Sequence, residues 1–167
     1  IFNSVSHGIG AGLAVAALVL TIVHSARFAE SGRLAIGVTS VSIYGTCLLI
    51  LYLMSTLYHA LTPNRAKNVF QIFDHSSIYL LISGTYTPFC LYGIGGSAGW
   101  TLFGIIWGMT VLGITLYSTM GNKMRTFSAV TYVVMGWVVV FYLPVLRRSI
   151  PETSMIFLLL GGLFYTL

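Results

Sequence analysis

Charged side chains are scarce in this chain. Of its 167 residues only 7% are Asp, Glu, Lys or Arg, and Asp and Glu together number 3. A soluble domain carries about 25% charged residues, so this sequence lacks the polar groups that a water-facing surface requires. Hydrophobic residues make up 57% of the chain. The composition therefore indicates an integral membrane protein.

The stretches without a charged residue locate the membrane spans. They cover residues 1–26, 34–64, 75–122, 126–146 and 153–167. A helix of about 20 apolar residues crosses the hydrocarbon core, and the first four stretches reach that length. The third is too long for one span, and the turn-forming glycines of its segment 93–99 divide it.

We therefore predict six spans in an all-α, polytopic transmembrane helical bundle, which forms one domain over residues 1–167. The spans cover about 2–26, 36–60, 70–92, 99–120, 126–146 and 153 onward. A β-barrel would need alternating polar and apolar residues, whereas AALVLTIV and CLLILYLM do not alternate. The chain begins and ends inside hydrophobic segments, so we expect a longer, truncated parent.

Other features are absent as well. The first segment has no basic start and contains Asn3 and His7, so it is not a cleavable signal peptide. Cys47 and Cys90 lie in different spans without C-x-x-C spacing, which favours two small apolar residues. The net charge of +5 comes from scattered Lys and Arg, so we expect membrane lipids and no nucleic acid as partners. The oligomeric state stays open.

The loops bear on the orientation of the chain in the membrane. The predicted loops cover residues 27–33, 60–68, 91–99, 120–125 and 147–152. Lys and Arg are equally frequent in the first, third and fifth loops and in the second and fourth, so the positive-inside rule does not decide the orientation by itself. Glu30 and Glu152 both lie in odd loops. We therefore place the even loops and the N-terminus on the cytoplasmic side.

Polar residues inside spans are costly and mark candidate functional sites. Asn3 and His7 are four residues apart, as are Ser55 and His59, so each pair shares one helix face. The third span begins near Asp74. An up-down-up path brings the start of the first span, the end of the second and the start of the third to one membrane face.

Imidazole and carboxylate groups are common zinc ligands, and a catalytic zinc keeps three protein ligands and one open position. Hydroxyl and amide groups, here those of Ser55 and Asn3, are suited to hydrogen-bond to the metal ligands and to orient them. The residues alone favour a zinc site and a plain polar cluster equally. Asp74 also suits a helix N-terminus stabilised by the dipole. His24 is expected to be an interfacial residue at the opposite face, and His75 a structural one.

The motifs in combination resemble the PAQR/hemolysin III family, which includes bacterial hemolysin III-like inner-membrane proteins and the adiponectin and progestin receptors. The similar segments are NSVSHGIGAGL, STLYHAL and FDHSSIYLLISGTYTPF, and the resemblance covers essentially the whole chain. The resemblance implies a parent with seven helices in a bacterial inner (plasma) membrane.

The resemblance implies that His59 binds zinc, that Asp74 holds the metal-bound water, and that Ser55 supports the site. Asn3 and His7 match the first motif and are expected to be supporting residues, although the glutamate of that motif would precede Ile1. An H-x3-H motif, which supplies two further ligands in the family, does not occur in this chain. The fragment alone is therefore expected to hold half a site.

The expected function is zinc-dependent hydrolysis of a lipid amide or ester close to the cytoplasmic face. Asp74 would be the general base, supported by Ser55. No G-x-S-x-G motif occurs, which argues against a serine nucleophile. The alternatives are a cytolytic pore and a receptor with a purely structural zinc. A pore needs a continuous polar stripe. The hydroxyl residues of the third and fourth spans are simpler to explain as helix-packing residues; they are Ser83, Thr85, Thr87, Thr110, Thr115 and Ser118.

Overall fold

The computed structural model describes residues 2–63 and 65–166, and these are helical apart from short connections. The helices are α1 (Phe2–Phe28), α2 (Leu34–Ala60), α3 (Arg65–Pro88), α4 (Gly96–Met120), α5 (Arg125–Trp137), α6 (Leu143–Ser149) and α7 (Glu152–Thr166). A 3-10 segment, Val138–Tyr142, joins α5 to α6. The predicted all-α transmembrane helical bundle is confirmed, and α5, this segment and α6 together cover the predicted fifth span. That all six predicted segments cross the membrane stays a prediction.

Within the described residues, four helical segments are long and apolar enough to cross a membrane: Phe2–Phe28, Leu34–Ala60, Gly96–Met120 and Arg125–Ser149. α3 is not among them, since its first turn carries Arg65 and Lys67 and its interior is rich in hydroxyl side chains. α7 is a shorter apolar helix. Hydropathy alone thus identifies the helices that face lipid better than it identifies α3, which packs against several neighbouring helices.

The start of the third span differs from the prediction. We expected it near residue 70, but α3 begins at Arg65, and the connection predicted at 60–68 shrinks to 61–64, of which residue 64 lies outside the described part. A stretch without charged residues predicts which part of a helix lies inside the membrane, but it does not predict where the helix begins and ends. Asp74 therefore lies in the third turn of α3. The helix dipole acts within the first turn, so this explanation of Asp74 is wrong.

The turn between α3 and α4 lies where the glycines predicted it. After Pro88 the chain forms one π-helical segment, Phe89–Ile94, and Gly95 and Gly96 then adopt positive φ angles of 63° and 55°. Gly99 packs against the backbone of this segment, since a Cβ there would lie 2.1 Å from the Cys90 carbonyl oxygen. A wide π turn followed by a tight glycine turn reverses the chain.

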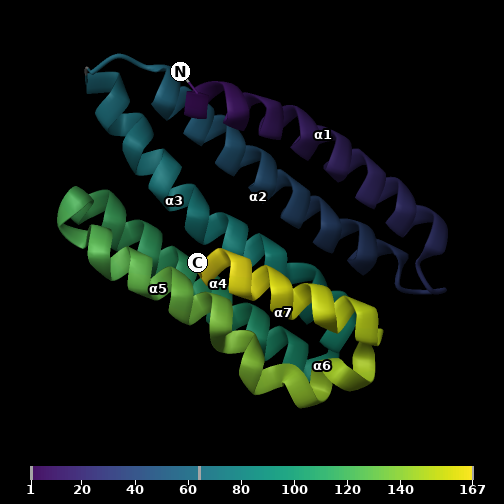
Figure 1. Cartoon of the computed structure of the whole chain (residues 1–167). Coiled ribbons are helices and arrows are strands. Elements are labelled where there is room, and N and C mark those ends of the chain that lie inside the picture. The colour runs from purple at the N-terminus through teal and green to yellow at the C-terminus, as the bar shows by residue number, and fades with distance from the viewer. Residues whose placement is uncertain (1, 64, 167) are drawn as a thin grey trace.

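The helices pack in sequence order. In Figure 1, α1, α2 and α3 lie side by side as one layer, and α4 to α7 lie along the other side of α3. α1 packs mainly on α2, whereas α3 contacts α2, α4 and α5. The large exposed side chains are spread over most helices, α1 and α7 included, as expected for helices that face lipid.

The core lies between α3, α4 and the α5–α6 segment. It contains Tyr79, Tyr86, Leu102, Ile106 and Met135, all buried. The Tyr86 hydroxyl donates to the Met135 and Gly136 carbonyl oxygens (2.8 and 2.9 Å) and accepts from the Val139 N–H (2.9 Å). It thus fills the place where the fifth span changes from α-helix to 3-10 helix.

Hydroxyl side chains also join α3 to α4. Ser83 hydrogen-bonds to Thr110 across the two helices, and Trp107 Nε1 donates to Thr87 Oγ1 at 3.1 Å. Helix packing was predicted for six hydroxyls, and the contacts confirm it for these three. Thr85 and Thr115 instead donate to carbonyl oxygens of their own helices. Thr115 and Ser118 are exposed, so the prediction is wrong for these two. The two cysteines, Cys47 and Cys90, are free and buried, as expected for small apolar residues.

Candidate functional site

Two of the predicted site residues meet between α1 and α2. His7 Nδ1 lies 2.6 Å from Ser55 Oγ, and Ser55 is 5% exposed. The His7 ring stands edge-on to the His59 ring, with centroids 5.7 Å apart. The spacing of four residues puts Ser55 and His59 on one face of α2. The start of α1 and the end of α2 thus share one membrane face, as predicted.

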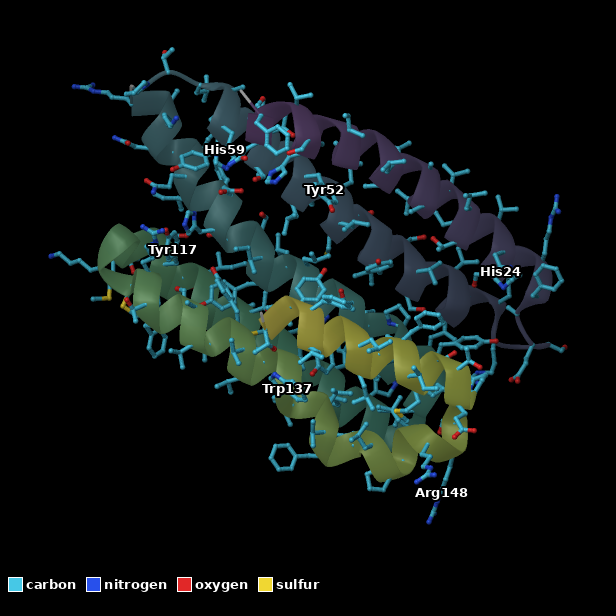
Figure 2. All side chains as sticks on the ribbon, viewed as in Figure 1. His24, Tyr52, His59, Tyr117, Trp137 and Arg148 are labelled. Carbon is cyan, nitrogen blue, oxygen red and sulfur yellow. The ribbon has the colours of Figure 1, made fainter. Side chains whose placement is uncertain are left out.

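The hydrogen bond between His7 and Ser55 fixes the orientation of the imidazole. A neutral histidine has one donor and one acceptor nitrogen, and the partner at one nitrogen determines the role of the other. If Ser55 accepts from Nδ1, then Nε2 of His7 carries a free lone pair. The ring also contacts Tyr52, with centroids 6.1 Å apart. Figure 2 shows Tyr52 and His59 along the same helix.

Tyr58 connects this pair of imidazoles with α3. Its ring centroid lies 4.9 Å from that of His59 and 6.4 Å from that of His75. Lys67 Nζ lies 5.2 Å from the same ring and donates to the Leu61 carbonyl oxygen at 3.0 Å. Sequence reasoning missed Tyr58, although it stands directly before His59 in the S-x3-H motif.

Asp74 and His75 lie on α3 and are mostly buried, with side chains 16% and 21% exposed. Asp74 Oδ2 is 3.8 Å from His75 Nδ1, and this nitrogen is 3.0 Å from the Gln71 carbonyl oxygen, to which it can donate. The His75 ring stacks on Tyr117 of α4 with centroids 5.2 Å apart. These contacts agree with the expected structural role of His75.

Two tyrosines of neighbouring helices, Tyr117 of α4 and Tyr132 of α5, contact α3 close to Asp74. Tyr132 of α5 donates its hydroxyl to the His75 carbonyl oxygen at 2.8 Å. The Asp74 carboxylate is within electrostatic reach of the Tyr117 and Tyr132 hydroxyls. Neither tyrosine was identified from the sequence, because a tyrosine in an apolar helix has the pattern of an ordinary packing residue.

Asn3 is placed differently from the other predicted residues. It lies exposed in the first turn of α1, and its carbonyl oxygen accepts from Ser6 Oγ at 3.1 Å. The neighbouring Ser4 makes the link to α2, since its hydroxyl donates to the Thr56 carbonyl oxygen at 3.4 Å. A contact between the Asn3 side chain and the site is not found among the described residues. Its supporting role stays a prediction.

The donors can be compared with the needs of zinc. Within residues 2–63 and 65–166, no three His, Cys, Asp or Glu side chains lie close enough together to hold one metal ion. A zinc site requires three or four protein ligands. His7 and His59 are of the right chemical type and their rings are in contact, and Asp74 lies on the neighbouring helix α3. A zinc ion bound here would need further ligands besides these residues.

The fold and these contacts define a polytopic helical membrane protein with three histidines and one carboxylate toward one membrane face, namely His7, His59, His75 and Asp74. The family model for Haemolysin-III related proteins matches residues 1–167, and the chain belongs to this family. The family predicted from the motifs is confirmed, and with it the integral membrane location.

Two relatives are similar along almost the whole chain. Hemolysin-3 of Bacillus cereus is 36% identical over 166 residues, which cover 99% of this chain and 74% of that protein. The Hemolysin-3 homolog of Bacillus subtilis (strain 168) is 37% identical over 166 residues, covering 99% of this chain and 76% of that protein. No solved structure matches the chain.

Proposed function

We propose that this chain carries one side of a zinc centre that hydrolyses a lipid amide or ester at the cytoplasmic face of the membrane. The observation that carries the proposal is the meeting of His7, Ser55 and His59 across α1 and α2, where two imidazoles face each other beside a buried hydroxyl. Such a group is costly within a membrane bundle and is typical of a functional site.

Each residue then has a role. His59 binds the metal directly, and His7, held by the Ser55 hydroxyl, maintains the polar surroundings of the ligand. Asp74 takes up and returns a proton as general base, since its side chain is 16% exposed and stays within reach of solvent at the face. A bound zinc ion would polarise the substrate carbonyl and lower the pKa of a water molecule.

The substrate class follows from the location. α1 and α2 are long enough to cross the bilayer, and His7 and His59 lie close to their ends on one face. A site at this depth reaches the amide or ester groups of lipids, which lie at the boundary between headgroup and acyl chain. The missing ligands fit the H-x3-H motif that the family resemblance implies. The proposal therefore concerns the full-length natural protein.

The pore alternative receives no support from the contacts. Ser83, Thr87 and Thr110 bond across the α3–α4 interface instead of lining a channel. The relatives bear the name Hemolysin-3, so leakage of dye from liposomes is the direct test of this alternative.

The deciding measurement is the metal content of the full-length natural protein purified in mild detergent. We expect stoichiometric zinc in the parent, its loss in His59→Ala, and its retention in Asp74→Asn. His24→Ala is the matched control, because His24 lies at the other end of α1, and it should keep the zinc. Size-exclusion profiles and melting temperatures show whether each variant folds.

Incubation with labelled ceramide then distinguishes a zinc-dependent hydrolase from a protein in which zinc is purely structural. The parent and His24→Ala should release fatty acid, and Asp74→Asn should lose about 100-fold or more in rate, as removal of a general base typically does. A parent without zinc, or His59→Ala that retains it, would contradict the metal site. Zinc without turnover of amide or ester lipids would leave a purely structural metal.

A further inference from the structure

A second candidate site lies at the opposite membrane end. There a crevice of about 800 Å³ opens between the end of α1, the start of α2 and the segment from Pro88 to Gly93. Its walls are mainly apolar and include Leu20, Val23, Val41, Phe89 and Ile150. This volume and lining are typical of pockets that bind small amphiphilic molecules.

The crevice is a consequence of the local backbone. The π-helical segment Phe89–Ile94 widens the end of the third span, and such segments often occur at functional sites. Gly37 and Ser40 of α2 also line the crevice and are buried, and Gly37 lets α1 approach closely, since a Cβ there would lie 2.8 Å from Ser25 Oγ. The neighbouring loop is fixed to the same segment, because Arg33 donates to the Tyr92 carbonyl oxygen and lies 4.3 Å from the Tyr92 ring.

Arg27 and Arg33, which lie nearest to the crevice in the sequence, have different surroundings. Arg33 forms an ion pair with Glu30 at 3.4 Å and is further held by Tyr92. Arg27 lines the crevice and is exposed. The ion pairs found among the described residues join Arg33 to Glu30 and His75 to Asp74, and neither involves Arg27. Arg27 is thus a positive charge at the crevice without an acidic partner in the described chain.

His24 adds a second polar group one turn before Arg27. It also lines the crevice, and its ring lies 4.7 Å from that of Phe28. His24 is separated from His7 by about 25 Å along α1, given a rise of about 1.5 Å per residue. The crevice and the histidine cluster thus lie near opposite surfaces of a bilayer with a core about 30 Å thick.

We propose that this crevice binds an anionic phospholipid from the surrounding bilayer. One acyl chain lies along the apolar walls, and the phosphate accepts hydrogen bonds from the Arg27 guanidinium, with His24 beside it. An Arg–phosphate contact is charge-assisted and can be bidentate, so it is stronger than a neutral contact. This site is independent of the zinc proposal, because it uses none of the same residues and lies at the other end of the bundle.

The test compares two lipids that differ only in headgroup charge. The full-length natural protein is delipidated in mild detergent, and binding of phosphatidylglycerol and of phosphatidylcholine with identical acyl chains is measured by native mass spectrometry. The parent should bind phosphatidylglycerol about tenfold more tightly, as expected for a hydrogen-bonded charge pair. Arg27→Gln should reduce this preference to about onefold.

Arg148→Gln is the matched control. Arg148 is an exposed arginine at the same end of the bundle, on α6, and Figure 2 shows it well apart from His24. Its replacement should leave the preference unchanged. Val41→Phe fills the floor of the crevice and should weaken binding of both lipids together, with the melting temperature showing that the variant is folded.

Three results would overturn the proposal. Equal binding of both lipids by the parent would exclude headgroup recognition. Equal losses in Arg27→Gln and Arg148→Gln would indicate attraction by general surface charge. Unchanged binding in a folded Val41→Phe would show that the acyl chain lies elsewhere. Zinc content, measured in the same preparations, should be unaffected by these variants, which keeps this test separate from that of the metal site.

Discussion

α1 and α3 are of similar length, 27 and 24 residues, but differ in almost every other respect. α1 buries only Ala11 and Ala14, packs mainly on α2 and exposes most of its large apolar side chains. α3 carries Arg65, Lys67 and Asp74, yet it packs against α2, α4 and α5. Eight of its residues between Ser76 and Thr87 are buried. The more polar helix is thus the central one.

This difference follows from the membrane as solvent. Lipid tails are as apolar as leucine, so an apolar surface gains little from contact with another helix. Hydroxyl groups and small residues stabilise a contact between helices more, because lipid tails cannot form hydrogen bonds with them or pack as closely. α3 has such residues on several sides, and α1 contributes to the site through one end only.

The largest expected effect separates the two helices directly. Leu81→Ala on α3, where Leu81 is 5% exposed, should lower the free energy of unfolding by about 2 kcal/mol, since it leaves a cavity between helices. Leu13→Ala on α1, where Leu13 is 67% exposed, should change it by about 0.5 kcal/mol or less, because lipid fills the space. Unfolding in mixed detergent micelles measures both. Equal losses would contradict the central position of α3.

A smaller effect is expected for the contact between α3 and the fifth span. Tyr86→Phe removes a hydroxyl that bonds Met135, Gly136 and Val139, and should cost about 1.5 kcal/mol, near the upper end for hydrogen bonds in membrane bundles. Tyr165→Phe on α7 is the control, because Tyr165 is 73% exposed. A loss of the same size in both variants would show that the buried contact adds nothing.

The smallest effect on stability is expected at the N-terminal end of α1, where His7 contacts Ser55 of α2. Ser55→Ala breaks the hydrogen bond to His7 and should cost about 0.6 kcal/mol, the average for such bonds between membrane helices. If the proposed metal centre exists, its affinity for zinc should fall 10-fold or more, because His7 loses its orientation. Zinc titration of the full-length protein measures this, with Ser42→Ala as control. An unchanged affinity would remove His7 and Ser55 from the site.

Much of the fold was predictable from the sequence. Charge-free stretches predicted six spans, the glycines of 93–99 predicted the turn after the third, and the spacing of Ser55 and His59 predicted a shared face of α2. Counting the spans also predicted that His7 would lie at the level of His59, and their rings are 5.7 Å apart. These features follow from local composition and from helix geometry.

Other features of the site were not predictable. The beginning of α3 at Arg65 was missed, because a helix extends beyond the apolar part of its sequence. The contacts of Tyr58 and Tyr117 with the histidines were missed, because an aromatic residue in an apolar helix can face lipid or a neighbouring helix with the same sequence pattern. Asn3 shares its face with His7 in the sequence, but lies exposed at the end of α1.

The sequence by itself determined that this is a helical membrane protein of the haemolysin III family, which segments form its helices, and that His7 and His59 lie at the same level. Hydropathy and helical spacing are local properties, so a linear sequence suffices for them. Only the tertiary structure decided that α3 is central, that Ser55 orients His7, and that a crevice forms beside Arg27. These depend on which helices meet, and in a membrane a face toward lipid and a face toward a neighbour have similar compositions.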